Sequence, residues 1–185
     1  MPTIFTHAAV PLLLGAAAGP RRISRRLLGA GAIAAMLPDA DTVGFGLGIA
    51  YSSDFGHRGA THSAVFALAM ALVAAASSRW LRTSPWRAFG FVGLATLSHS
   101  LLDALTDGGL GVALAWPFED KRFFFPWRPI EVSPIGAGFF SARGLAVIGS
   151  ELFWVVLPTA ILAVALWAWR RRCDGRREMP QRHMP

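Results

Sequence analysis

Residues 145–169 read LAVIGSELFWVVLPTAILAVALWAW and form the clearest apolar stretch of the chain. A helix of about 20 predominantly apolar residues crosses the hydrocarbon core of a bilayer, and this stretch has 25. Three arginines follow it directly, at 170–172. The composition agrees, since 54% of the 185 residues are hydrophobic and 16% are charged. We therefore predict a membrane-spanning helix here and an integral membrane protein overall.

Four further stretches are apolar enough to enter a bilayer. They are Ile4 to Gly19, Leu27 to Tyr51, His62 to Ser78 and Ala88 to Leu105. The sequence thus predicts an all-α, integral membrane helical bundle of about five transmembrane segments. Because the first segment is short, four spans with a re-entrant first segment are the alternative. The predicted organisation is a single transmembrane domain over 1–169 with an outer loop at 108–144, followed by a basic cytoplasmic tail at 170–185.

Basic residues are distributed unevenly between the connections. Thirteen of the 18 Lys and Arg residues lie at 21–26, at 79–87 and after Trp169, whereas nine of the 11 carboxylates lie in or beyond the opposite half. Because short cytoplasmic loops hold the excess of positive charge, the N-terminus is predicted outside and the C-terminus in the cytoplasm. The net charge of +7 is thereby a topology signal. Because the arginines flank apolar spans, the expected partner is the lipid bilayer, and nucleic acid is not expected to bind.

Several ionisable side chains lie within or beside the apolar stretches, where burial is unfavourable unless the group is paired or hydrated. They are His7, Asp39, Asp41, His57, His62, His99, Asp103 and Glu151. At a rise of ~1.5 Å per helical residue, those within the predicted spans lie roughly 18 to 28 Å from the nearest cytoplasmic arginine. Five segments therefore bring polar groups to one level in the outer half of the membrane, as metal ligands would be placed.

Two pairs carry the strongest local signals, and each also has an ordinary explanation. His99 and Asp103 are spaced i, i+4 on one helix face, where they can hold one ion or hydrogen-bond to each other or to a neighbouring helix. Asp39 and Asp41 follow Pro38, a pattern that also favours a simple helix-to-loop turn. The sequence leaves both explanations open for each pair.

The remaining candidates are also open to a second interpretation. His62 can be an exposed residue in the first turn of a helix that Thr61 caps. His7 can bond a neighbouring helix, and Glu151 can reach the membrane interface as a lone carboxylate. His57 lies in the outer loop, where a polar side chain is hydrated without any ligand.

The residue types favour a metal ion held by nitrogen and oxygen. Cys173, the only cysteine, lies in the basic tail, so a cysteine-based site is excluded. Imidazoles mixed with carboxylates suit zinc, with Mn2+ and Fe2+ as alternatives. The candidates exceed the three or four ligands of one zinc ion, so one to three divalent ions are predicted. Such ions activate water for attack on a phosphoester, and Asp39 and Asp41 are the predicted catalytic residues that position or deprotonate it.

The outer loop contains WPFEDKRFFFPWRPI at 116–130, in which aromatic and basic residues alternate. Aromatic rings collect at the headgroup level of a membrane. Arg58, Arg122 and Arg128 are the predicted substrate-binding residues, because guanidinium groups hold the phosphate of a lipid or lipid-linked phosphoester. The alternative is an interfacial segment that anchors the loop without touching substrate.

The order and spacing of these motifs resemble a known family. His7 is followed by LPDAD at 37–41, HRGATHS at 57–63, HSLLDALTDGG at 99–109 and WPFEDKRFFFPWRPI at 116–130. Over nearly the whole chain this series resembles the YdjM-like family of bacterial inner-membrane proteins, regarded as membrane-bound metal-dependent hydrolases. The resemblance implies a multi-pass protein of the bacterial inner (cytoplasmic) membrane with hydrolase activity.

The ligand pattern of that family is similar to that of zinc-dependent phospholipase C and related nucleases, which order His, Asp, His, His-xxx-Asp and Glu along helical chains. Carried over residue by residue, the resemblance implies as metal ligands His7, Asp39 or Asp41, His62 or His57, His99 with Asp103, and Glu151. One further His, expected shortly after the His-xxx-Asp pair, has no counterpart between Asp103 and Glu151. The implied set is therefore one ligand short of a three-zinc site.

Three functions are compatible with the sequence. The leading one is a metal-dependent hydrolase acting on a phosphoester at the outer face of the membrane. An ion or metal transporter would use the same His and Asp residues as a pathway, but it would also need ionisable groups in the inner half of the spans, where the sequence places none. A non-catalytic membrane protein, stabilised by its metal, is the third.

Overall fold

The computed structural model describes residues 1–134 and 136–177. This part of the chain is all-helical, and its β-structure is limited to two isolated bridges, Thr106 with Ile130 and Val112 with Phe123. The elements are α1 (Ile4–Ala18), α2 (Arg25–Met36), η1 (Leu37–Thr42), α3 (Val43–Gly46), η2 (Ala60–His62), α4 (Ala64–Ala76), α5 (Pro85–Ala104), η3 (Gly136–Phe139), α6 (Ala142–Glu151), η4 (Leu152–Val156) and α7 (Leu157–Arg177). The predicted all-α class is confirmed.

Local sequence signals explain where the helices begin and end. Ser24 caps α2 by accepting a hydrogen bond from the N–H of Leu27 at 3.1 Å. Ser63 caps α4 in the same way, accepting from the N–H of Phe66 at 3.0 Å. The first helix, α1, ends at Gly19, whose φ of +85° is readily adopted by glycine alone.

The second predicted span, Leu27 to Tyr51, is not one helix. The α-helix α2 ends at Met36, and the chain continues as the 3-10 helix η1 and the four-residue helix α3. Pro38 has no N–H to donate, and its ring crowds the carbonyl four residues earlier, which disfavours a regular α-helix at this point. The expectation of a continuous helix here is therefore wrong, and the acidic residues of LPDAD lie in a tighter turn.

One helical stretch of the described residues is long and apolar enough to cross a membrane. It runs from Ala142 to Asp174, 33 residues, and comprises α6, η4 and most of α7. Most of its apolar side chains face outward, with Ile161 63% and Val164 64% exposed, while Val147 and Val155 are buried against the rest of the chain. The apolar helices α1 and α4 are shorter than a full span, so the five-span bundle and its orientation stay predictions.

The predicted tail at 170–185 begins as helix. The last helix, α7, continues to Arg177, past the end of the apolar stretch. Residues 178–185 lie outside the described part of the chain.

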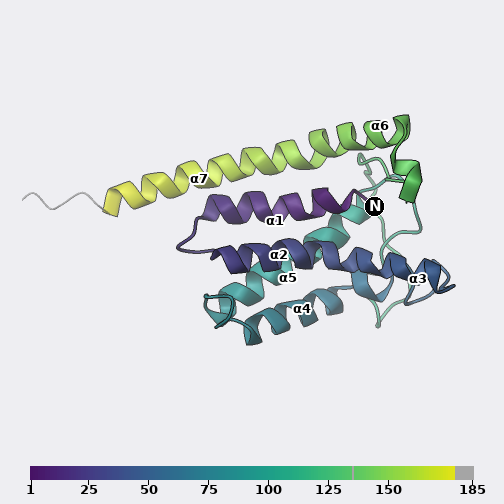
Figure 1. The fold of residues 1–185 in the computed structure, drawn as a ribbon, viewed down its shortest axis with the longest axis horizontal. Coiled ribbons are helices and arrows are strands. Elements are labelled where there is room, and N and C mark those ends of the chain that lie inside the picture. The colour runs from purple at the N-terminus through teal and green to yellow at the C-terminus, as the bar shows by residue number, and fades with distance from the viewer. Residues whose placement is uncertain (135, 178–185) are drawn as a thin grey trace, which may run out of the picture.

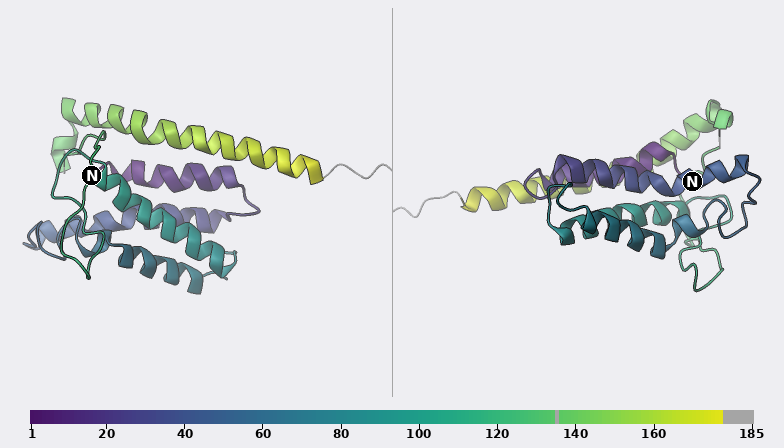
Figure 2. Two further views of the ribbon diagram at one scale, coloured as in Figure 1. Left: turned by 180° about the vertical axis from the view of Figure 1, so that it is seen from behind. Right: turned by 60° about the horizontal axis from the view of Figure 1, so that its bottom comes forward.

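Successive long helices alternate in direction (Figure 1). The turns α1–α2 and α4–α5 lie at one end of the bundle, together with the C-terminal part of α7. The N-terminus, α3 and α6 lie at the opposite end, which both views of Figure 2 also show. The arginine-rich connections are thereby separated from the end that holds η1, η2 and the C-terminal end of α5.

Small residues allow the helices around Phe91 of α5 to approach closely. A Cβ atom at Gly15 of α1 would lie 2.5 Å from Leu28 and 2.8 Å from the Phe91 ring. A Cβ at Gly31 of α2 would overlap the same ring. The glycines therefore let α1 and α2 close over α5, which fixes the position of His99 two turns further along α5.

Candidate metal centre

The end of the bundle opposite the arginines holds a buried cluster of His and Asp side chains. His7 comes from α1, Asp39 and Asp41 from η1, His57 and His62 from the segment around η2, and His99 and Asp103 from α5. All seven side chains are at most 4% exposed. Four separate segments therefore converge, and we call these seven residues the His/Asp cluster.

Four members of the cluster are arranged to hold one ion. Each of Asp39, His62, His99 and Asp103 offers a nitrogen or oxygen atom, and these four atoms lie within 4.8 Å of one another. The Nε2 atoms of His62 and His99 are 3.0 Å apart. Asp39 Oδ1 is 3.4 Å from His99 Nε2, and Asp103 Oδ2 is 3.4 Å from His62 Nε2. We call this set the four-ligand site.

The hydrogen bonds of the Nδ1 atoms of His62 and His99 indicate the protonation of the two rings. His99 Nδ1 is 2.7 Å from the carbonyl oxygen of Ala35, so Nδ1 carries the proton and donates it. His62 Nδ1 is 3.1 Å from Thr61 Oγ1, and because this hydroxyl donates its own proton to Asp41 Oδ2, it accepts from Nδ1. With both rings neutral, each Nε2 atom can offer its lone pair to an ion lying between them, whereas without an ion the two nitrogens are at hydrogen-bonding distance from each other. Two zinc–nitrogen bonds of about 2.0–2.1 Å would satisfy both lone pairs.

The carboxylates of the four-ligand site make no hydrogen bonds, although Asp103 forms an ion pair with Arg58, so Asp39 is the unpaired one. Both oxygens of Asp39 and both of Asp103 are buried without a hydrogen-bond partner, as are both ring nitrogens of His7. Burying an unpaired carboxylate is strongly unfavourable. A divalent cation among these atoms would provide the missing partner, so the residues present fit a bound metal ion.

The charges of the cluster lead to the same inference. Asp39, Asp41 and Asp103 bring three carboxylates into it. Among the residues that the structure describes, Arg58 is the one Lys or Arg whose side chain contacts these carboxylates, with Nε 3.0 Å from Asp103 Oδ2. With neutral histidines, two negative charges are left over, which one divalent ion would balance.

His7 lies at the margin of the four-ligand site. Its ring stacks on that of His99, with centroids 3.7 Å apart. Its Nε2 is 3.6 Å from Asp103 Oδ1, on the opposite carboxylate oxygen from the one that faces His62. His7 is therefore placed to contact Asp103 or to ligate an ion on that side.

Asp41 and His57 form a second group that shares His62. Asp41 Oδ1 is 2.7 Å from His57 Nδ1. Asp41 Oδ2 accepts hydrogen bonds from Thr61 Oγ1 at 2.7 Å and from the backbone N–H of Arg58 at 3.2 Å. The atoms of Asp41, His57 and His62 are close enough for a second ion. In the absence of one, Asp41 orients both imidazole rings.

Arg58 lies inside the protein rather than on its surface. Its side chain is fully buried and pairs with Asp103. The guanidinium also donates to the Gly108 carbonyl at 2.9 Å and to Thr106 Oγ1 at 3.0 Å. These contacts join the HRGATHS segment to the end of α5. A Cβ at Gly109 would approach Arg58 Nη1 to 2.7 Å, so the glycine makes room for this cation.

The other two predicted substrate-binding arginines differ from each other. Arg122 donates to the carbonyls of Tyr51, Ser53 and His57 at 2.9–3.1 Å. Its burial lowers the pKa of the guanidinium from the ordinary value. Arg128 is exposed and lies over the ring of Phe124, 4.8 Å from its centroid. Of the three arginines, Arg128 is the one exposed to solvent.

Glu151 contacts the start of α1. Its Oε1 accepts from the N–H of Thr3 at 2.5 Å, and its Oε2 accepts from the hydroxyls of Thr3 and Thr6 at 2.6 and 2.5 Å. A carboxylate at a helix N-terminus is also favoured by the helix dipole. Glu151 thus fixes the end of α1 that carries His7, and it is absent from both groups of potential ligands.

Several residues of the site carried no signal in the sequence. Thr3, Thr6, Thr106 and the Ala35 carbonyl hold Glu151, Arg58 and His99 in place. Their partners are 48 to 148 residues away in the chain, so spacing could not reveal them. The His/Asp cluster, in contrast, consists of the ionisable residues that stand out against an apolar background.

These features define the class of protein: an all-helical chain with one long, outward-facing apolar helix and a buried His/Asp cluster that fits a divalent ion. The chain belongs to the YdjM family of inner membrane proteins, whose family model matches residues 1–172. Inner membrane protein YbcI of Escherichia coli (strain K12) is 50% identical over 174 residues, covering 93% of this chain and 100% of the relative. The family resemblance found in the sequence is confirmed. No solved structure matches the chain.

Proposed function

We propose that this protein is a membrane-bound metal-dependent hydrolase that cleaves a phosphoester of a lipid or lipid-linked substrate at the outer face of the inner membrane. The observation that carries the proposal is the four-ligand site, in which two imidazole Nε2 atoms converge on two buried carboxylates, one of which, Asp39, has neither a hydrogen bond nor a Lys or Arg partner among the described residues. Two nitrogen and two oxygen ligands suit zinc, with Mn2+ and Fe2+ as alternatives. The proposal places one ion at this site.

The two acidic residues of η1 have different roles in the proposed reaction. A bound divalent ion supplies a Lewis acid and lowers the pKa of water. Asp39 has both oxygens free of hydrogen bonds, so one of them is available to position the attacking water. Asp41 is held by Thr61 and the Arg58 N–H, and it orients His57 and His62. Asp39 is therefore the stronger of the two candidate catalytic residues, and Asp41 serves as a positioning residue.

The membrane arrangement in the proposal is the five-span topology with the N-terminus outside. It is supported by the alternating direction of the long helices and by the separation of the arginine-rich turns from the His/Asp cluster (Figure 1). If the arginine-rich turns lie on the cytoplasmic side, the His/Asp cluster lies near the outer face of the membrane.

The exposed aromatic residues support a substrate that resides in the membrane. Phe118 is 87% exposed and Trp127 is 61% exposed, both in the segment that follows α5. This segment leaves α5 at the same end as Asp103. Aromatic rings of this kind insert at the headgroup level, which would bring a lipid phosphate close to the cluster. Arg128 is the exposed cation for that phosphate.

The test is the metal content of the purified protein. Inductively coupled plasma mass spectrometry should find at least one transition metal ion per chain, and His99→Ala should lose it. The matched control is Ser98→Ala, which removes only a hydroxyl bonded to the Ala95 carbonyl on the same helix. The metal-loaded protein should then hydrolyse bis(p-nitrophenyl) phosphate, and Asp39→Asn should not. Absence of metal from both the wild type and His99→Ala would overturn the proposal.

A further inference from the structure

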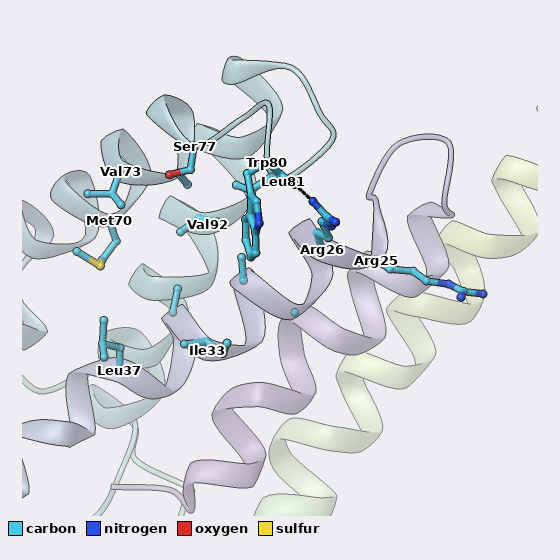
Figure 3. Close-up of a pocket in the computed structure, with 14 residues that line it drawn as sticks. Arg25, Arg26, Ile33, Leu37, Met70, Val73, Ser77, Trp80, Leu81 and Val92 are labelled. Atoms are coloured by element: carbon cyan, nitrogen blue, oxygen red, sulfur yellow. Dashed lines mark hydrogen bonds between the residues drawn. The ribbon is translucent and has the colours of Figure 1, made fainter.

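An apolar pocket opens at the arginine-rich end of the bundle, and none of the residues of the His/Asp cluster lines it. It has a volume of about 480 Å³ and is bordered by α2, α4 and α5 (Figure 3). Ile33 on α2, Leu37 at the start of η1, and Met70 and Val73 on α4 line it (Figure 3). We call it the α2–α4 groove. Its lining is almost entirely apolar apart from Ser77 and the side chains at its arginine end.

Small side chains make the groove hollow. Gly29, Ala30 and Ala34 on α2 and Ala74 on α4 contribute little volume to its floor. A Cβ at Gly29 would meet no atom within 4 Å. From Arg26 to Leu37 the groove follows α2 for ~16 Å, at ~1.5 Å per residue. This length equals about half of the ~30 Å hydrocarbon core, the depth of a single leaflet.

The polar end of the groove is cationic. Arg26 lies 5.4 Å from the centroid of the Trp80 ring and donates to the Trp80 carbonyl at 2.9 Å (Figure 3). A guanidinium has five N–H donors, so Arg26 retains several for an anion. Ser77 adds a hydroxyl to the same lining. Carboxylates are absent from the lining of this groove within the described residues.

The surrounding turns extend this positive charge. Six further arginines, at 21, 22, 25, 79, 82 and 87, lie in or beside the two turns, and residues 19–26 and 77–87 contain no Asp or Glu. All six are exposed. An apolar slot that opens onto such a surface is complementary to a molecule with a hydrocarbon chain and an anionic head.

We propose that the α2–α4 groove binds one acyl chain of an anionic phospholipid, with the headgroup phosphate held by Arg26 and Ser77. The length of the groove matches a chain that enters from one leaflet, and the charge at its mouth matches the phosphate. The site is distinct from the His/Asp cluster and does not depend on the proposed hydrolase activity.

The experiment uses the full chain, purified in detergent, with phosphatidylglycerol as probe and phosphatidylcholine as the neutral-headgroup comparison. Native mass spectrometry should detect one retained phosphatidylglycerol and at least tenfold weaker binding of phosphatidylcholine. Gly29→Leu fills the groove and should weaken phosphatidylglycerol binding at least tenfold. Its matched control is Gly90→Leu on α5, where a Cβ also meets nothing within 4 Å but the residue does not line the groove.

A charge variant tests the headgroup contact separately. Arg26→Gln should remove most of the preference for phosphatidylglycerol, whereas Arg87→Gln, an exposed arginine outside the groove lining, should retain it. Metal content should stay at the wild-type level in Gly29→Leu, which shows that the variant is folded. Equal phosphatidylglycerol binding by Gly29→Leu and Gly90→Leu would overturn the proposal. A dimer that Gly29→Leu dissociates would also overturn it, because a second copy of the chain would then fill the groove.

Discussion

The Nε2 atoms of His62 and His99 lie 3.0 Å apart, although the Nδ1 atom of each ring already donates to an oxygen. This contact brings two imidazole nitrogens together inside a buried site, where a cation between them would be bound by both. We therefore expect the stability of the protein to depend on the metal, because removal leaves the buried Asp39 carboxylate uncompensated.

Metal removal should lower the melting temperature. Without the metal, the buried charges of the His/Asp cluster should lower the free energy of unfolding by about 3 kcal/mol. For a chain of this size, that change lowers Tm by roughly 6–12 °C. The measurement is differential scanning fluorimetry in detergent before and after treatment with a chelator, followed by readdition of Zn2+. A Tm that is insensitive to chelation in wild type, with metal shown to be removed, would contradict this expectation.

The buried ion pair of Arg58 and Asp103 should be strongly coupled. Arg58→Met leaves Asp103 without its guanidinium, 3.0 Å away, and should reduce the free energy of unfolding by about 3–5 kcal/mol. Asp103→Asn leaves Arg58 unpaired in the same way. The double variant should be destabilised by clearly less than the sum of the two, as measured by thermal unfolding. Additive effects would show that the two residues act independently.

Glu151 should stabilise α1 without binding metal. Glu151→Gln weakens the charge-assisted hydrogen bonds to Thr3 and Thr6 and should cost about 1.5–3 kcal/mol of stability. Its metal content should equal that of the wild type. Glu131→Gln is the control, since Glu131 is a partly exposed carboxylate paired with Arg143. Loss of metal in Glu151→Gln alone would instead make Glu151 a ligand, as the family resemblance implies.

Asp39 and Asp41 should differ in their effect on metal affinity. Asp39 lies in the four-ligand site, so Asp39→Asn should abolish tight binding there. Asp41 lies 3.2 Å from His62 Nδ1, the ring nitrogen that faces away from the four-ligand site. Asp41→Asn should therefore weaken metal affinity about 10–100-fold, as is usual when the partner of a metal-binding histidine is removed. Zinc titration with a competing fluorescent chelator measures both. Equal losses would indicate that Asp41 ligates an ion directly, together with His57.

The sequence predicted the His/Asp cluster better than the path of the chain through it. Helical spacing correctly placed His99 and Asp103 on one face of α5, because that face is set by local geometry. The two acidic residues of η1 reach the same cluster for another reason, since Pro38 breaks the helix and turns them inward. A depth count along a continuous helix therefore does not describe the structure that brings them to the cluster.

The partners of Arg58 and Glu151 could not be predicted. Each is a charged side chain whose hydrogen-bonding groups are distant in sequence, Gly108 and Thr106 for one and Thr3 for the other. Charge type and position alone do not separate a substrate-binding arginine from an internal counter-ion, or a metal-ligating carboxylate from a helix anchor. Such roles depend on tertiary packing, which periodicity does not encode.

The single cysteine provides a direct test of the proposed topology. Cys173 lies near the end of α7, on the arginine-rich side of the apolar stretch. If that side is cytoplasmic, a membrane-impermeant maleimide should leave Cys173 unmodified in intact spheroplasts and modify it after permeabilisation. Phe118→Cys in a Cys173→Ser background should be modified in both, because Phe118 is exposed at the opposite end. The reverse labelling pattern would invert the orientation and place the His/Asp cluster at the cytoplasmic face, where a phosphoester substrate would have to be sought instead.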